Sequence, residues 1–377
     1  MLTSLRMGRV AGIDIKVHVS FALILAFGGM QWGAAFGPRG AVFGVFSTVL
    51  LFSCVLLHEL GHSLVAKAYG IPVKEITLWP FGGVAQLGAK PKNPKEELLI
   101  SIAGPAVNVV LAVLFFVGGF LWLGLSGLEA AMADIGRSSP TTVTLLALML
   151  GSNVVLAVFN LLPALPMDGG RVLRALLSFR LGHSKATAIA ANVARVISVA
   201  MFAAAVVFGH VMLGIIALVV FFGAGREAAD QKVGESLAAV RAGGAVNPHA
   251  LVLGPSTPVG EAVKAMVQSG QSAFAVMHYG RLLGVVARDA LLRAAGVEGP
   301  AAYVAGAMQR HFPMISSTAT LEEARQKMNE TVSPYVVVAD GERYLGLVTE
   351  LELSRHLVPA QSMASGLGWV KSLFFRG

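Results

Sequence analysis

The stretch FSCVLLHELGHSLVAKAYG, residues 52–70, carries two histidines and a glutamate inside an otherwise apolar run. Such groups are costly to bury at membrane depth unless they pair with one another or bind something. His58 and His62 are four residues apart, so on a helix they face the same side, with Glu59 beside them. Two imidazoles at this spacing can occupy two corners of a tetrahedral zinc site, and the glutamate can act as a general base. We therefore expect a metal site here in preference to a pair of surface histidines.

The composition indicates a membrane protein. Of 377 residues, 55% are hydrophobic and only 13% are charged, whereas soluble domains carry about 25% charged residues. Several apolar runs approach the roughly 20 residues that a bilayer-spanning helix needs. They are residues 18–36, 41–69, 97–125, 141–161, 186–208 and 210–226. We predict a polytopic α-helical membrane protein with about six transmembrane helices, followed by a soluble α+β tandem.

The domain organisation follows from the change in composition after Arg226. Two similar segments begin at Val259 and Leu321, and each predicts a helix, a strand, a glycine turn, a second strand and a helix. The expected divisions are a six-span membrane domain at 1–228, a linker at 229–243, the soluble tandem at 244–358 and a C-terminal tail at 359–377.

Basic residues predict the orientation in the bilayer. They gather before the first span, between spans two and three, and between spans four and five: Arg6, Arg9, Lys16, Lys74, Lys90, Lys92, Lys95, Arg171, Arg174, Arg180 and Lys185. Cytoplasmic loops carry such an excess, so we expect the N-terminus, the opening of the site and the soluble tandem to be cytoplasmic, in the cell membrane. The same loops explain the net charge of +8, and because no nucleic-acid motif is present we expect no nucleic-acid partner.

A zinc site needs a third protein ligand, and Asp168 in LPMDGG is the best candidate. It is an acidic residue in an apolar region, at the end of the fourth predicted span. The alternative is that Asp168 caps the helix that begins at Gly169. We favour the ligand role because no other carboxylate lies at the right depth.

Three motifs together resemble the site-2 protease family of intramembrane zinc metalloproteases. They are HELGH in the second span, SIAGPAVN at 101–108 and NLLPALPMDGG at 160–170. The resemblance implies that His58, His62 and Asp168 bind one zinc ion per chain. It also implies that Glu59 activates the attacking water.

Further roles follow from the same resemblance. Asn160 would steady the substrate or the oxyanion, and Asn108 would play a structural or substrate-contacting part. Residues 75–88, EITLWPFGGVAQLG, predict a hairpin. Its edge, with Gly82, Gly83 and Val84, would bind an unwound substrate segment by strand addition, the alternative being a simple Gly-Gly turn.

The soluble half resembles a tandem of cystathionine-β-synthase (CBS) domains, which commonly bind adenine nucleotides. Where that family supplies a hydroxyl and a carboxylate, the first repeat has Ala287 and Ala290, and the second has Thr349 and Glu352. The resemblance therefore implies at most one adenine-nucleotide site. The alternative is a packing or dimerisation module, through which the chain would form a homodimer.

The predicted function is an intramembrane zinc metalloprotease that cleaves a peptide bond in or near a transmembrane segment of a membrane-protein substrate, modulated by nucleotide at the CBS tandem. The alternative is a CBS-gated ion or metal transporter. A transporter would usually show inverted repeats and several broken helices, whereas here the polar groups converge on one site.

Overall fold

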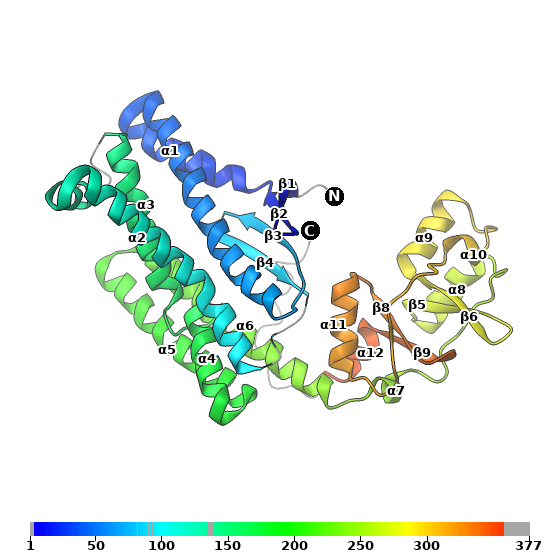
Figure 1. Cartoon of the computed structure of the whole chain (residues 1–377). Coiled ribbons are helices and arrows are strands. Elements are labelled where there is room, and N and C mark those ends of the chain that lie inside the picture. The colour runs from blue at the N-terminus through cyan, green and yellow to red at the C-terminus, as the bar shows by residue number, and fades with distance from the viewer. Residues whose placement is uncertain (1–3, 81, 89–90, 92, 134–138, 358–377) are drawn as a thin grey trace. The chain divides into compact units, whose positions relative to one another are not determined.

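The computed structural model describes residues 4–80, 82–88, 91, 93–133 and 139–357 (Figure 1). Within it the chain forms two compact units, Met1–Ala228 and Ala229–Gly377, and each is described by itself. The predicted tail at 359–377 lies outside the described residues, as do Lys90 and Lys92 of the basic loops.

The first unit is built mainly of helices. They are α1 (Phe21–Ala68), α2 (Pro94–Ala133), α3 (Thr142–Asn160), α4 (Asp168–Leu181), α5 (His183–Phe208) and α6 (Val211–Ala238). In the described part of the chain, five of these, all except α4, are long and apolar enough to cross a membrane. The predicted polytopic helical fold is confirmed, while the number of six spans stays a prediction.

Helix α1 contains a sharp break. Phe36 and Gly37 leave the helical region, Gly37 with a φ of 63°, and Pro38 follows. A Cβ placed on Gly28 would lie 2.2 Å from the Thr48 hydroxyl oxygen, although residues twenty apart in a straight helix are separated by about 30 Å. Helix α1 therefore folds back at Gly37 into two adjacent segments, which correspond to the first two predicted spans.

A four-stranded sheet lies beside these helices. Its strands are β1 (Ser4–Val10), β2 (Ile13–His18), β3 (Val73–Trp79) and β4 (Gly82–Leu87), in the order β1-β2-β3-β4. Strands β2 and β3 are parallel, and the other two pairings are antiparallel. The expected hairpin at 75–88 is formed by β3 and β4, whereas β1 and β2 were not predicted. Strand β4 lies at an edge of the sheet.

One buried cluster joins the sheet to α1 and α2. Ile13 and Ile15 of β2 pack with Leu60 of α1, Ile76 of β3 and Ile100 of α2. Leu60 lies between the two histidines of the motif, on the opposite side of α1. The packing of Leu60 in this cluster therefore fixes how α1 is turned relative to the sheet.

The segment between α3 and α4 is tightly folded. Ala164 and Leu165 are almost fully buried against an alanine-rich surface of α5 and α6. A Cβ on Gly169 would lie 2.3 Å from backbone atoms of Leu161, and one on Gly170 would lie 2.3 Å from the Leu165 nitrogen. The two glycines after Asp168 are therefore required for the chain to fold over the start of α4.

Three charged side chains hold α4 in place. The Arg174 guanidinium donates to Glu97 of α2 at 2.7 Å and to Glu227 of α6 at 2.6 Å. Although burial opposes its charge, the two carboxylates raise the pKa of Arg174 above its usual value. Because α4 begins at Asp168, this cluster also fixes the position of that carboxylate.

The second unit contains the two predicted repeats. The first comprises α8 (Val259–Ser269), β5 (Ala273–His278), β6 (Arg281–Ala287) and α9 (Arg288–Val297). The second comprises α11 (Leu321–Thr331), β8 (Tyr335–Asp340), β9 (Arg343–Thr349) and α12 (Glu350–Arg355). The remaining elements are α7 (Ala242–Ala245), α10 (Val304–Ala307) and β7 (Met314–Ile315). The soluble α+β tandem is confirmed.

Buried residues from both repeats form one shared cluster that includes Val285 of β6 and Tyr335 of β8. Residues 229–243, expected to form a linker, are largely helical, since α6 continues to Ala238. Leu237 is fully buried in the core of the second repeat, so this segment belongs to the packed structure of the second unit.

Candidate active site

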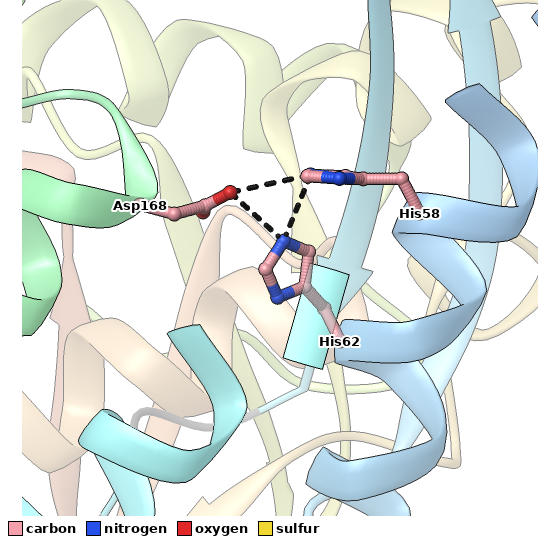
Figure 2. A group of neighbouring side chains, drawn as sticks. All are labelled: His58, His62 and Asp168. Atoms are coloured by element: carbon pink, nitrogen blue, oxygen red, sulfur yellow. Dashed lines mark hydrogen bonds and ion pairs between the residues drawn. The ribbon is translucent and has the colours of Figure 1, made fainter. Parts of the chain in front are cut away.

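His58, His62 and Asp168 meet at one point, as Figure 2 shows. The two Nε2 atoms are 3.1 Å apart. Asp168 Oδ2 lies 3.2 Å from Nε2 of His58 and 3.1 Å from Nε2 of His62. The histidines come from adjacent turns of α1, and the aspartate comes from the first residue of α4. Residues 106 positions apart in the sequence thus form one cluster.

The hydrogen bonds of the two rings determine where their protons lie. Nδ1 of His62 lies 2.6 Å from the carbonyl oxygen of Ile100, and a carbonyl can only accept, so this nitrogen carries a proton. Nδ1 of His58 lies 2.5 Å from Oδ1 of Asn108 and carries a proton for the same reason. In neutral rings both Nε2 atoms then present lone pairs.

Two lone pairs and a carboxylate oxygen that point at one another repel unless a cation lies among them. The three atoms are 3.1–3.2 Å apart, close to the edge of about 3.3 Å of a tetrahedron with zinc–ligand bonds near 2.0 Å. Nitrogen and oxygen donors of this kind suit zinc. The residues present therefore fit a zinc ion, with His58, His62 and Asp168 as its holders.

Asn108 lies behind His58. Its Nδ2 donates to Oδ1 of Asn153 at 2.9 Å, and Asn153 donates in turn to the carbonyl of Met149 at 2.9 Å. Both asparagines have no exposed surface. Asn108 was expected to have a structural or substrate-contacting part, and this placement makes it an orienting partner of His58. The contribution of Asn153 was missed, although an amide inside an apolar span was a usable signal.

Gly104 of the SIAGPAVN segment allows α2 to approach the cluster. A Cβ at this position would lie 2.2 Å from Nε2 of His62. Gly61 on α1 is also close to α2, since a Cβ placed there would lie 2.9 Å from the carbonyl oxygen of Ala103. The two helices therefore pack closely beside the His62 ring, which brings the carbonyl of Ile100 within reach of His62.

Asp168 does not cap α4. The N-cap position is Met167, and Asp168 is the first helical residue. The capping alternative therefore does not describe the structure, and the buried carboxylate points toward the histidines (Figure 2).

A cavity of about 940 Å³ opens onto the cluster. Lining residues on each helix recur at helical spacing, so α1 and α3 each present one face to it. The predicted site residues that line it are His58, Glu59, His62, Gly82, Gly83, Val84, Asn160 and Asp168. Gly83 is so close to Glu59 that a Cβ there would lie 2.6 Å from Glu59 Cγ. Strand β4 thus borders the general-base candidate directly.

In the second unit Thr349 and Glu352 bond to each other. The Glu352 carboxylate accepts from the Thr349 backbone nitrogen at 3.0 Å and also from its hydroxyl. The pair forms a capping box at the start of α12, and both side chains are buried. Their polar atoms thus stabilise a helix end, and a nucleotide contact stays a prediction.

Known proteins share both halves of the chain. Residues 46–205 match peptidase family M50, and residues 242–296 and 304–359 each match the CBS domain. A zinc metalloprotease of Methanocaldococcus jannaschii is 32% identical over 354 residues, covering 93% of this chain and 95% of the relative. A solved structure, the site-2 protease from the same organism, is 35% identical with a TM-score of 0.44, covering 60% of this chain and 95% of that one.

The match over nearly the whole length of a zinc metalloprotease extends through the HELGH and DGG motifs and the paired repeats. With its apolar helices, the chain is a multi-pass membrane protein and an enzyme that uses zinc. It belongs to peptidase family M50, the site-2 protease family of zinc metalloproteases, and carries a C-terminal tandem of CBS domains.

Proposed function

We propose that the chain hydrolyses a peptide bond in or near a transmembrane segment of a membrane-protein substrate, with His58, His62 and Asp168 as the zinc ligands. One observation carries this proposal: two imidazole lone pairs and a carboxylate oxygen converge within 3.1–3.2 Å in a cavity between apolar helices. Glu59 lines the same cavity. The family assignment favours this reading over the transporter alternative.

The residues divide the chemistry between them. When bound, zinc supplies Lewis-acid chemistry, which lowers the pKa of water and polarises a peptide carbonyl. Glu59 takes the proton of the attacking water and passes it to the leaving amine, so that a C–N bond breaks and a C–O bond forms. The amide of Asn160, at the end of α3, donates to the oxygen on which negative charge develops. Asn108 and the Ile100 carbonyl hold the two imidazoles in the required tautomer.

Strand β4 is the proposed binding site for the segment to be cut. It is an edge strand, and Gly82, Gly83 and Val84 line the cavity that holds Glu59. The carbonyls of a transmembrane helix are already hydrogen-bonded within the helix, so the substrate must unwind before hydrolysis. An unwound segment can pair with the free edge of β4, and the absence of a side chain at Gly83 allows it to approach Glu59.

The proposed orientation is supported by the basic residues that the sheet and α4 carry. Lys16 and Lys74 lie on β2 and β3, and Arg171, Arg174 and Arg180 lie on α4. We propose that these elements, the opening of the cavity and the CBS tandem are all cytoplasmic.

The proposed domain limits are 1–228 for the protease and 244–358 for the tandem, and residues 229–243 connect them and pack through Leu237 in the core of the second repeat. We propose that the tandem forms a homodimer and that an adenine nucleotide bound there modulates cleavage. The proposed modulation is supported by α6, which runs from Val211 to Ala238 and so belongs to both units. Equal activity of the purified enzyme with and without ATP would contradict the modulation.

The deciding experiment measures zinc content and cleavage of a transmembrane reporter for wild type and Glu59→Gln in liposomes. We expect about one zinc per chain in both proteins and cleavage only by wild type. If both proteins bind zinc and neither cleaves the reporter, the proposed hydrolysis of a transmembrane segment is contradicted for this reporter. Absence of zinc from both would refute the assignment of the metal site.

A further inference from the structure

Helix α4 carries two arginines about one turn apart, of which one is buried and the other is exposed. Arg174 is buried and bonded to two carboxylates. Arg171 is exposed and lines the catalytic cavity. Within the described part of the chain, its guanidinium has no hydrogen bond or ion pair. The fold thus uses the charge of Arg174 and leaves that of Arg171 available in the cavity.

The position of Arg171 follows from helical spacing. It lies three residues after Asp168, so its side chain leaves α4 on nearly the same side as the metal-binding carboxylate. It is also close enough to Glu59 for its charge to act on that side chain. Arg171 therefore borders the place where the reacting peptide must lie.

The charges of the cavity indicate what Arg171 could bind. Among the described lining residues the acidic ones are Glu59 and Asp168, and Arg171 is the one lysine or arginine. A divalent cation held by the cluster balances the two carboxylates. The charge of Arg171 then remains uncompensated, which favours an anionic group on the ligand.

We propose that Arg171 is a substrate-binding residue that holds a carboxylate of the peptide next to the scissile bond. The proposal rests on the proposed function of the same site. A guanidinium presents parallel N–H donors that fit a carboxylate in a bidentate manner. Two sources can supply this group: an acidic side chain that flanks the scissile bond, or the new C-terminal carboxylate of the product.

The first arm of the test addresses the acidic side chain. Reporter peptides carry a single Glu or Gln at successive positions flanking the bond that wild type cuts, and kcat and KM are measured in liposomes. We expect kcat/KM for the Glu peptide to exceed that for the Gln peptide by about five-fold at one or two neighbouring positions, chiefly through KM. Arg171→Gln should abolish this preference and Arg171→Lys should retain part of it. Arg180→Gln, an exposed arginine near the end of α4, is the matched control and should retain the full preference.

The second arm addresses the product carboxylate without turnover. A short leucine-rich peptide with either a free or an amidated C-terminus binds to Glu59→Gln protein, and the affinity is followed by fluorescence anisotropy. If the product supplies the carboxylate, the free form binds about five-fold more tightly, and Arg171→Gln in the same background removes the difference. The difference should also shrink at high salt, because Arg171 is exposed.

Zinc content is measured for every variant and should be unchanged. The proposal is overturned if wild type discriminates neither peptide pair, or if the discrimination survives in Arg171→Gln. An equal fall in kcat for all peptides also overturns it, because Arg171 would then act on the oxyanion and not on a carboxylate. Failure of the proposed function would give a different result: zinc is absent, or no reporter is cut. In the second case the affinity measurements with free and amidated peptides still test the role of Arg171.

Discussion

Replacement of Asn108 by leucine should weaken zinc binding although Asn108 does not touch the metal. Asn108 accepts from Nδ1 of His58 at 2.5 Å and donates to Asn153 at 2.9 Å, with no exposed surface. Leucine has a similar volume, so Asn108→Leu removes both hydrogen bonds without creating a large cavity.

The magnitude follows from what the lost bond maintains. Without the Asn108 acceptor, the His58 ring is no longer held in the tautomer that presents Nε2 to the metal. Loss of such an outer partner typically reduces metal affinity by about 10–100-fold, which corresponds to about 1.4–2.7 kcal/mol. The buried Nδ1–H also loses its partner, so the free energy of unfolding should fall by about 1–3 kcal/mol.

The assay is competition for zinc with a chelator of known affinity, at fixed pH in detergent. Asn192→Leu is the control, because Asn192 is an exposed amide on α5. Asn153→Leu should give a smaller loss than Asn108→Leu, since Asn153 acts through Asn108. Zinc affinity of Asn108→Leu within two-fold of wild type would refute the tautomer reasoning.

Three further changes have defined outcomes. Gly104→Ala introduces a Cβ 2.2 Å from Nε2 of His62, so we expect loss of zinc and of cleavage; normal zinc content would contradict the close packing. Arg174→Met removes the guanidinium from the buried Glu97 and should cost about 3–5 kcal/mol of stability in chemical unfolding, a loss that the exposed Arg180→Met should not reproduce. Serine hydroxyls donate to the Asp340 carboxylate and lower its pKa below 3.8. The ionised carboxylate therefore stabilises the folded protein above that pH, and this stabilisation is lost as the pH falls through the pKa of Asp340 in the folded state. Asp340→Asn should therefore show a smaller drop in melting temperature on acidification than wild type, and an identical pH profile would contradict this assignment.

The grouping of His58, His62 and Asp168 could be predicted from the sequence, because titratable residues are rare in membrane-spanning segments and therefore informative. His58 and His62 share a helix side by spacing alone, and Asp168 was the remaining carboxylate at a suitable depth. The structure brings the three together. The partners of the rings were harder to predict, because the acceptor for His62 is a backbone carbonyl, which every residue possesses.

The sheet shows a different limit. The hairpin of β3 and β4 was predicted from its glycines and its weak alternation, but β1 and β2 were not. Ile13 and Ile15 alternate with polar residues, as a half-buried strand requires. The basic residues around them suggested a loop, and the parallel pairing of β2 with β3 joins segments about sixty residues apart, which local patterns do not show.

The two arginines of α4 show why residue type alone does not reveal a role. From the sequence, both Arg171 and Arg174 contributed equally to the prediction of orientation. In the structure Arg174 fixes α4, and with it Asp168, through Glu97 and Glu227. A helix held in this way can present Arg171 at a constant position in the cavity. The buried ion pairs thus fix α4, and with it the Asp168 carboxylate and the position from which Arg171 would bind a substrate carboxylate.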